Sequence, residues 1–124
     1  METLLDDCKF IFDHSTLPFG IAEVTVDENN QPVDCIYRYI NKPMEAYWTT
    51  PTENLIGKGF YEIWPNSDFT WRDHFYQAAF QGIASEFDSV SVALEQFFHA
   101  MVFPLQPPYC AFSIQDVKIG RAHV

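Results

Sequence analysis

Hydrophobic residues near the start of the chain recur at the spacing of one face of an α-helix. The stripe consists of Leu4, Leu5, Cys8, Ile11 and Phe12, and the opposite side is polar and mostly acidic. Pro18 disfavours helical backbone at Leu17. The pattern therefore predicts an amphipathic helix over residues 1–15. Phe10 lies outside the stripe and requires a second surface to cover it.

Residues 21–26 and 33–40 change to the two-residue period of β-strands. The first segment alternates apolar and polar side chains, and the second is rich in the β-branched and aromatic residues that favour strands. Residues 27–32, with the sequence Asp-Glu-Asn-Asn-Gln-Pro, have the chemistry of a turn. The three segments together predict a β-hairpin.

Helical spacing returns in the middle of the chain as several short segments. Asn41 is a favourable N-cap for the first of them, because its side-chain oxygen can accept a hydrogen bond from a free backbone N–H group. Short helical turns are predicted near residues 44–48, 52–56 and 60–64, with helix-breaking residues between them.

A longer helix is predicted to begin at the polar residues 66–68 and to end before Gly82. Its apolar stripe consists of Trp71, His74, Phe75, Ala78 and Ala79. Three strand-like runs follow at residues 86–94, 97–105 and 109–117. The predicted order is one helix, two strands, several short helices and three strands, with no internal repeat.

Four short phrases in the sequence resemble phrases of PAS domains. They are Phe12-Asp13-His14 leading to Gly20-Ile21-Ala22, Tyr39-Ile40-Asn41-Lys42-Pro43-Met44, Asn54-Leu55-Ile56-Gly57-Lys58, and Ser113-Ile114-Gln115-Asp116-Val117. With the order of elements, they make the chain resemble the PAS family over residues 12–117. It looks most like PAS domains found upstream of diguanylate cyclase or histidine kinase outputs in bacteria. The last phrase departs from the usual one, with Val117-Lys118 in place of Ile-Thr.

This resemblance implies an α+β, PAS-like fold, in which a five-stranded antiparallel sheet carries short helices over one face. Residues 1–15 would form the amphipathic helix, residues 16–117 the PAS domain, and residues 118–124 a tail or the start of an output linker. It implies a sensory, signal-transduction module that binds a small ligand or a partner and catalyses nothing. The signal would leave through Asp116 toward a C-terminal output domain that is absent from this chain.

Composition and charge narrow the class of protein. The 124 residues fit one domain, and 48% hydrophobic and 17% aromatic residues argue against disorder. A formal net charge of −10 repels nucleic-acid phosphates and anionic lipid headgroups. No apolar run approaches the roughly twenty residues of a membrane span. We therefore expect a cytoplasmic protein with no nucleic-acid partner and no membrane insertion of this segment.

Cofactor chemistry finds little support in the sequence. Cys8, Cys35 and Cys110 lack zinc-site spacing and are expected to be free thiols in a reducing compartment. Flavin-binding light sensors with a similar fold carry a reactive cysteine on a central helix, and no cysteine lies between Cys35 and Cys110. Haem-binding PAS domains use a histidine on the long helix, where His74 lies, but a hydrogen-bonded core histidine is the more common case. We expect no catalytic residues, no metal and no cofactor, so that the purified protein is colourless.

A small-molecule site is usually an apolar pocket with a few polar groups. The candidate lining residues are Ile36, Arg38, Ile40, Met44, Trp48, Phe60, Trp64 and Phe75. In PAS domains the hydrophobe before the residue equivalent to Asn41 faces the cavity, and strand alternation would bring Arg38 to the side of Ile40. An inward guanidinium matches a carboxylate, which suggests a small organic acid as ligand. The alternatives are a carboxylate of the protein beside Arg38, Arg38 in water, and aromatic residues that only pack a core.

The N-terminal stripe offers more apolar surface than one face of a sheet needs to cover. We therefore expect a homodimer joined partly through Leu4, Leu5, Cys8, Ile11 and Phe12. The alternative is that the helix packs back onto its own sheet.

Two other classes of function stay open. One is a small cone-shaped α+β enzyme of the ketosteroid isomerase type, in which a Tyr and a carboxylate transfer a proton. Tyr37, Tyr39, Asp34 and Asp88 are the candidates for those roles. The other class is an interaction module with a filled core and no ligand.

Overall fold

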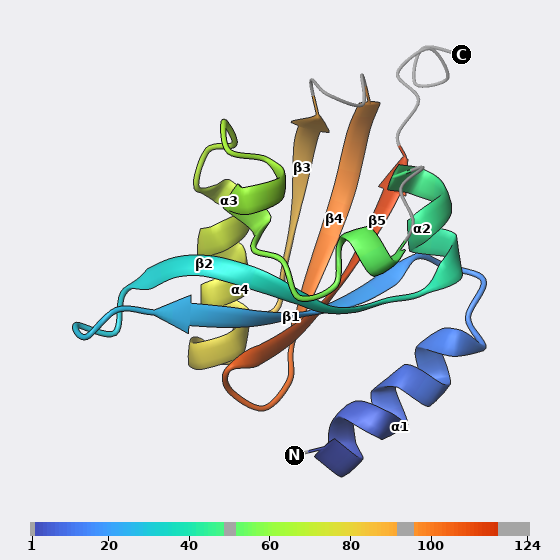
Figure 1. The fold of residues 1–124 in the computed structure, drawn as a ribbon, viewed down its shortest axis with the longest axis horizontal. Coiled ribbons are helices and arrows are strands. Elements are labelled where there is room, and N and C mark those ends of the chain that lie inside the picture. The colour runs from blue at the N-terminus through green and yellow to red at the C-terminus, as the bar shows by residue number, and fades with distance from the viewer. Residues whose placement is uncertain (1, 49–51, 92–95, 117–124) are drawn as a thin grey trace.

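The computed structural model describes residues 2–48, 52–91 and 96–116 (Figure 1). The elements along the chain are α1 (Glu2–Asp13), β1 (Phe19–Val26), β2 (Pro32–Ile40), α2 (Lys42–Trp48), the 3₁₀ turn η1 (Thr52–Asn54), α3 (Phe60–Ile63), α4 (Thr70–Gln81), β3 (Ser85–Ser91), β4 (Gln96–Pro104) and β5 (Tyr109–Asp116). This is the predicted order of elements. None of the described helices has the length and the apolar character needed to cross a membrane.

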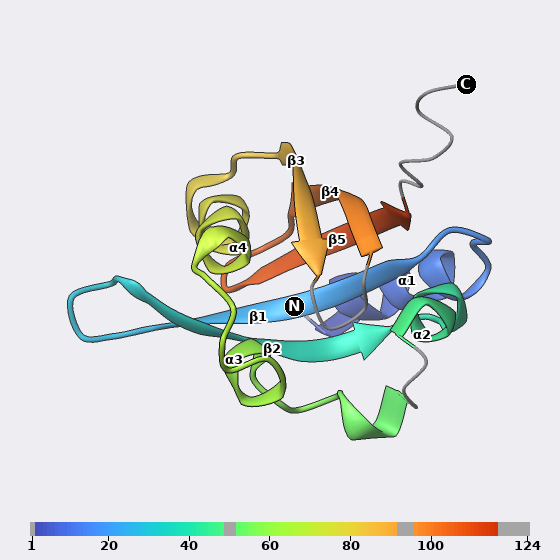
Figure 2. The same cartoon turned by 90° about the horizontal axis from the view of Figure 1, so that it is seen from above.

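The five strands form one antiparallel sheet with the order β2-β1-β5-β4-β3. The first and the last strands of the chain, β1 and β5, therefore lie side by side near the centre of the sheet. Figure 2 shows the strong twist of the sheet as a change of strand direction between β2 and β3. The twist wraps the sheet around α4, which contacts β1, β2, β4 and β5. The predicted α+β fold, with a five-stranded antiparallel sheet and short helices, is confirmed.

The side of the sheet that faces α3 and α4, called the inner face below, carries the hydrophobic core. Phe75 and Ala78 of α4 are 0% exposed and pack against this face, as their helical stripe predicted. From the centre of the sheet, Phe112 of β5 reaches the same core and its ring centre lies 5.1 Å from that of Phe75. A methyl group on Gly20 of β1 would collide with the Phe112 ring, so the core requires glycine at this position. The helix ends at Gly82, whose φ of 68° is left-handed, as predicted.

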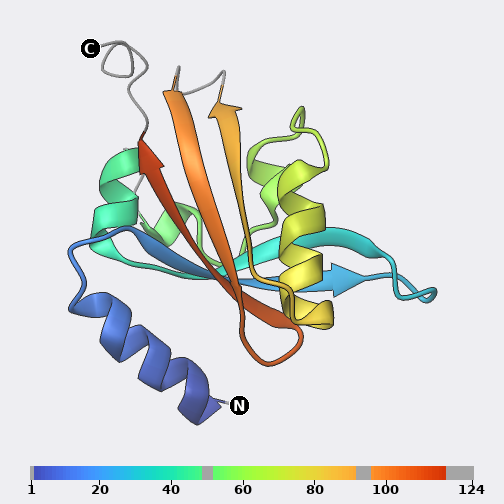
Figure 3. The same cartoon turned by 180° about the vertical axis from the view of Figure 1, so that it is seen from behind.

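The outer face of the sheet receives the end of α1. Figure 1 and Figure 3 show α1 on one side of β1, with α2 and α3 on the other. The ring of Phe12 stacks on that of Phe19 with 4.4 Å between ring centres, and the Tyr39 hydroxyl donates a hydrogen bond to Asp13. Of the predicted dimer residues, Phe12 and Cys8 are half-buried and Ile11 is 64% exposed. The side chains of Leu4 and Leu5 lie outside the described residues. Phe10 is also exposed.

Asn41 connects α1, β1 and α2 at the point where the chain passes from β2 to α2. Its Oδ1 accepts hydrogen bonds from the N–H groups of Phe19 and Met44, and its Nδ2 donates to the carbonyl groups of Phe12 and Leu17. The predicted N-cap is confirmed by the bond from Met44. The other three bonds give the buried side chain a second task, which is to hold the α1–β1 junction against α2.

The starts of β1 and of the long helix differ from the sequence prediction by two residues or more. β1 begins at Phe19, two residues before the predicted start, because Phe19 and Gly20 also pair with β5. The long helix begins at Thr70, later than the polar run that was expected to cap it. Asp68 still satisfies a free N–H group at this end, since its Oδ1 accepts from the Thr70 backbone at 3.0 Å.

Candidate ligand-binding site

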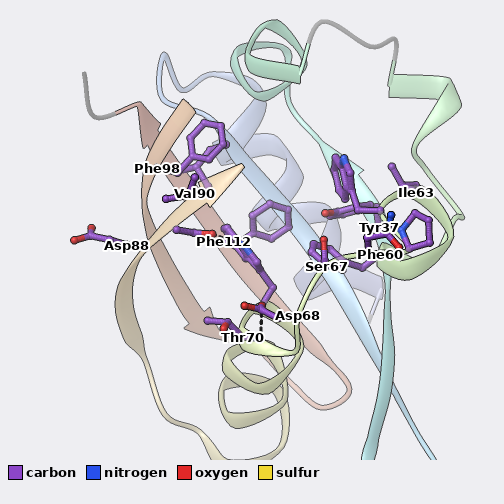
Figure 4. Close-up of a pocket in the computed structure, with 16 residues that line it drawn as sticks. Tyr37, Phe60, Ile63, Ser67, Asp68, Thr70, Asp88, Val90, Phe98 and Phe112 are labelled. Carbon is purple, nitrogen blue, oxygen red and sulfur yellow. Dashed lines mark hydrogen bonds between the residues drawn. The ribbon is translucent and has the colours of Figure 1, made fainter. Parts of the chain in front are cut away.

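A pocket of about 800 Å³ lies between the inner face and the α3–α4 region (Figure 4). Its walls come from β2, β3, β4 and β5 on the sheet side, and from α3, the α3–α4 loop and the start of α4 on the other side. The sheet contributes Tyr37, Phe98, Phe112 and Ile114. The volume is within the range of about 300–1,000 Å³ that is common for small-molecule sites.

Aromatic rings from three elements line one end of the pocket. Trp64 meets Tyr37 edge-on at 6.1 Å and Phe60 at 5.3 Å between ring centres. Phe60 also lies 6.4 Å from Trp71, which brings the first turn of α4 into the same group. We call Tyr37, Phe60, Trp64 and Trp71 the ring cluster. These rings contact one another at the edges, in the tilted arrangements that aromatic side chains favour.

Hydrogen bonds hold the two helical walls in place. The Tyr61 hydroxyl donates to the backbone carbonyl of Asp68 at 2.7 Å, which fixes the α3–α4 loop. Burial raises the pKa of Tyr61 to about 12, so the hydroxyl stays neutral and remains a donor. The Trp71 Nε1–H group donates to Ser89 Oγ at 3.2 Å and joins α4 to β3.

The polar lining lies mainly on the α3–α4 loop and the start of α4. It includes Asn66, Ser67, Asp68 and Thr70. Figure 4 shows Asp68 beside Thr70 at the edge of the pocket, whereas Asp88 points away from it. Asp88 accepts a hydrogen bond from His99 on the outer face, so Asp68 supplies the carboxylate of this site. No lysine, arginine or histidine is among the described residues that line the pocket.

Solved structures of sensory proteins are similar to this fold. A LOV protein from Rhodobacter sphaeroides has 13% identity, over 94% of this chain and 69% of its own, with a TM-score of 0.63. The PAS domain of Bordetella pertussis BvgS has 8% identity, over 96% and 93% of the two chains, with a TM-score of 0.56. The chain has a PAS fold. A sensory box histidine kinase from Vibrio cholerae adds a third likeness, at 15% identity over 94% of both chains and a TM-score of 0.57. No family model and no curated protein matches the sequence.

Within this PAS fold, the structure brings together only part of the predicted ligand site. Phe60 and Trp64 line the pocket. Ile40, Met44 and Phe75 are buried in the core beside it, at 5%, 0% and 0% exposure, and do not line it. The side chain of Trp48 lies outside the described residues.

The prediction that Arg38 points into the cavity is wrong, because β2 contains a β-bulge. Ile21 and Ala22 of β1 pair with Tyr39 and Tyr37 of β2, so the pairing skips Arg38. The extra residue breaks the two-residue alternation, so that Ile40 and Tyr37 both face the inner core. The inward position of Ile40 therefore does not carry over to Arg38.

Arg38 lies on the outer face with a carboxylate of the protein. Its Nε donates to Glu23 Oε1 at 2.8 Å, and 41% of its side chain is exposed. Ile36 pairs with Glu23 across the strands and lies on this face as well, outside the pocket. An organic acid gripped by Arg38 has no structural basis in this arrangement.

The sheet side of the pocket was not predicted from the sequence. Phe98, Phe112 and Ile114 were not among the candidates, and Tyr37 was considered only for proton transfer. A signal was present in the last strand, where the large inward residues alternate with the small outward residues Ala111 and Ser113. The loop residue Asp68 was expected only to cap a helix.

The histidine and cysteine positions do not fit the two PAS cofactors considered above. His74 Nδ1 lies 2.8 Å from Ser85 Oγ, and its ring stacks on Phe87 at 4.0 Å, so it does not line the pocket. Burial raises the pKa of the thiols of Cys35 and Cys110, and neither lines the pocket. Among the described residues, no group of three His, Cys, Asp or Glu side chains is placed to hold a metal ion.

The residues considered for isomerase-type chemistry are also dispersed. Tyr37 is buried on the inner face, whereas Tyr39 donates to Asp13 on the outer face. Asp34 Oδ1 accepts backbone N–H groups, including that of Cys35 at 2.7 Å. Tyr37 and Asp88 both line the pocket, but Asp88 points away from it and accepts a hydrogen bond from His99 on the outer face.

Proposed function

We propose that this PAS domain is a sensory module that binds a small, mostly apolar molecule in the pocket between its inner face and α3–α4. The observation that carries this proposal is the pocket itself, which has room for a ligand of ordinary size and a lining of rings with a few polar groups. A filled core would favour an interaction module, and the pocket is what argues against that class. The module catalyses nothing in this proposal.

The signal is proposed to leave along β5. Phe112 and Ile114 line the pocket, and the strand ends at Asp116, so a ligand would touch the strand close to its end. A ligand that favours one packing of these side chains shifts the balance between two arrangements of the domain. Residues 16–117 form the sensing unit in this scheme, and residues 118–124 begin the connection to an output domain on the C-terminal side.

We also propose that the module works in a reducing compartment such as the cytoplasm. Its three cysteines, Cys8, Cys35 and Cys110, are free, and the last two are buried in the core. Buried free thiols are typical of proteins that are not exposed to oxidising conditions.

Two neutral aromatic probes, indole and para-tert-butylphenol, test the proposal by NMR titration of the full chain. We expect both to shift the indole N–H signals of Trp64 and Trp71, which line the pocket, and to slow amide hydrogen exchange in β5. Ser67→Phe puts a ring between the two walls of the pocket (Figure 4) and should abolish these shifts. Thr16→Phe, at an exposed position outside the pocket, is the matched control and should leave them unchanged. Failure of both probes to bind would count against a ligand-binding role.

A further inference from the structure

We propose that the pocket selects an organic cation, a molecule in which an amine or quaternary ammonium group is joined to an apolar part. The inference rests on the proposed function, because it names the class of ligand for the same site. It replaces the organic acid that the sequence suggested, and it depends on the ring cluster, on one carboxylate and on the charges of the lining.

The ring cluster provides faces for a positive charge. Trp64 and Trp71 both line the pocket, and Phe60 lies between them at 5.3 and 6.4 Å from their ring centres. An ammonium group over the face of an aromatic ring is attracted by the ring quadrupole, and tryptophan gives the strongest attraction. Several rings at one end of an apolar pocket therefore favour a cationic group over a neutral group of the same shape.

Asp68 provides the opposite charge at the edge of the pocket. Its Oδ1 accepts the Thr70 N–H group, and within the described residues no donor bonds to its second carboxylate oxygen. The other acidic residue beside the pocket, Asp88, turns outward to His99. In this proposal the ammonium group of the ligand lies between the ring cluster and the carboxylate of Asp68, which gives the ligand a defined orientation.

An anionic ligand would find no counter-charge in the described lining. The nearest cation on α4, Arg72, has its guanidinium carbon 4.0 Å from the centre of the Phe69 ring and its Nη2 3.0 Å from Asp73, so it is held outside the pocket. An anion that is desolvated without a partner is costly to bind. The formal net charge of −10 adds a long-range field that attracts cations and repels anions.

Three phenols that carry tetrahedral para groups of different charge test this inference by calorimetric titration. They are para-trimethylammoniophenol, para-tert-butylphenol and para-phenolsulfonate, which are cationic, neutral and anionic. We expect the cation to bind at least about tenfold more tightly than the anion, which is about 1.4 kcal/mol at 25 °C. Asp68→Asn keeps the acceptor for the Thr70 N–H group. It should weaken binding of the cation about tenfold and change the affinity for the neutral phenol by no more than about twofold.

Glu28→Gln is the matched control, because it removes the same charge from the exposed turn of the β1–β2 hairpin. If Asp68→Asn and Glu28→Gln weaken binding of the cation equally, the affinity depends on net charge alone and the inference is overturned. An anion that binds as tightly as the cation would overturn it too. If only the neutral phenol binds, the inference is wrong and the proposed function stands. If none of the three binds, both are wrong.

Discussion

The two faces of the sheet use the same kinds of side chain for opposite purposes. The inner face is covered by α3 and α4, and its rings pack or line the pocket, with no basic side chain in the described lining. The outer face carries ion pairs in partial contact with water, such as Arg38 with Glu23 and His99 with Glu86 and Asp88. Under the proposed function, discrimination between ligands would take place on the inner side of the sheet. Charged side chains are few in the described lining of the pocket, which includes Asp68 on the α3–α4 loop and no lysine, arginine or histidine.

The pKa values of two histidines shift in opposite directions on the two faces. Burial, opposed by the nearby Asp73, lowers the pKa of His74 on the inner side. Hydrogen bonds that the His99 ring donates to Asp88 and, as the smaller cause, to Glu86 raise the pKa of His99 on the outer face. The same side chain is therefore shifted toward its neutral form on α4 and toward its charged form on the open face. The predictions below test whether the two faces differ as strongly in stability as they do in charge.

The largest effect is expected from the core of the inner face. Phe75 is 0% exposed and its ring lies between those of Trp71 and Phe112, at 5.6 and 5.1 Å. Phe75→Ala should lower the free energy of unfolding by about 3–5 kcal/mol, because it leaves a cavity that the neighbouring rings cannot fill. Phe97→Ala, at a position of the outer face that is 43% exposed, should lower it by about 0.5 kcal/mol or less. Denaturant unfolding measures both, and similar losses would contradict the contrast between the faces.

The second effect concerns the junction between the faces. Asn41 is 2% exposed and makes four hydrogen bonds that join α1, β1 and α2. Asn41→Ala should lower the free energy of unfolding by about 2–3 kcal/mol, since it leaves buried backbone groups without partners. Asn41→Asp keeps the two acceptor bonds, but it points a carboxylate oxygen at the carbonyl oxygens of Phe12 and Leu17, so at neutral pH it should be at least as destabilising as the alanine variant. An alanine variant as stable as the wild type would show that water replaces the side chain.

The fold could be predicted from the sequence because its signals are local. Asn41 and Gly82 marked helix ends, and alternation marked the strands, so the order of elements followed from short segments. The site could be predicted only in part, because it depends on contacts between distant segments. The bulge at Arg38 is a feature of strand pairing and reversed the expected direction of one side chain. The meeting of β5 with the α3–α4 loop likewise has no local signal, and for this reason Ile114 and Asp68 were missed.

The third prediction concerns self-association through the helix beside the outer face. Ile11 and Phe10 of α1 are 64% and 66% exposed, which leaves apolar surface for the homodimer expected from the sequence. Ile11→Glu should weaken dimerisation by at least about tenfold, which is about 1.4 kcal/mol. Asn29→Glu adds the same charge to the turn of the β1–β2 hairpin and should have no effect. Light scattering over a range of concentrations measures both, and a wild type that stays monomeric throughout would contradict the prediction.

The smallest effect is expected from His99. Its Nδ1 lies 2.8 Å from Asp88 Oδ1 and its Nε2 lies 2.9 Å from Glu86 Oε1, and only the protonated ring can donate to both carboxylates. Because the folded-state pKa is raised, the stabilisation is fully present below the pKa of the unfolded state and is lost as the pH rises through the folded pKa. Asp88→Asn should lower the His99 pKa in an NMR titration more than Glu86→Gln does, since the bond to Asp88 is the larger cause. The variants should leave the pKa of His74 unchanged, because His74 belongs to α4 on the other side of the sheet. A His99 pKa that does not respond to either substitution would show that the two hydrogen bonds do not persist in solution.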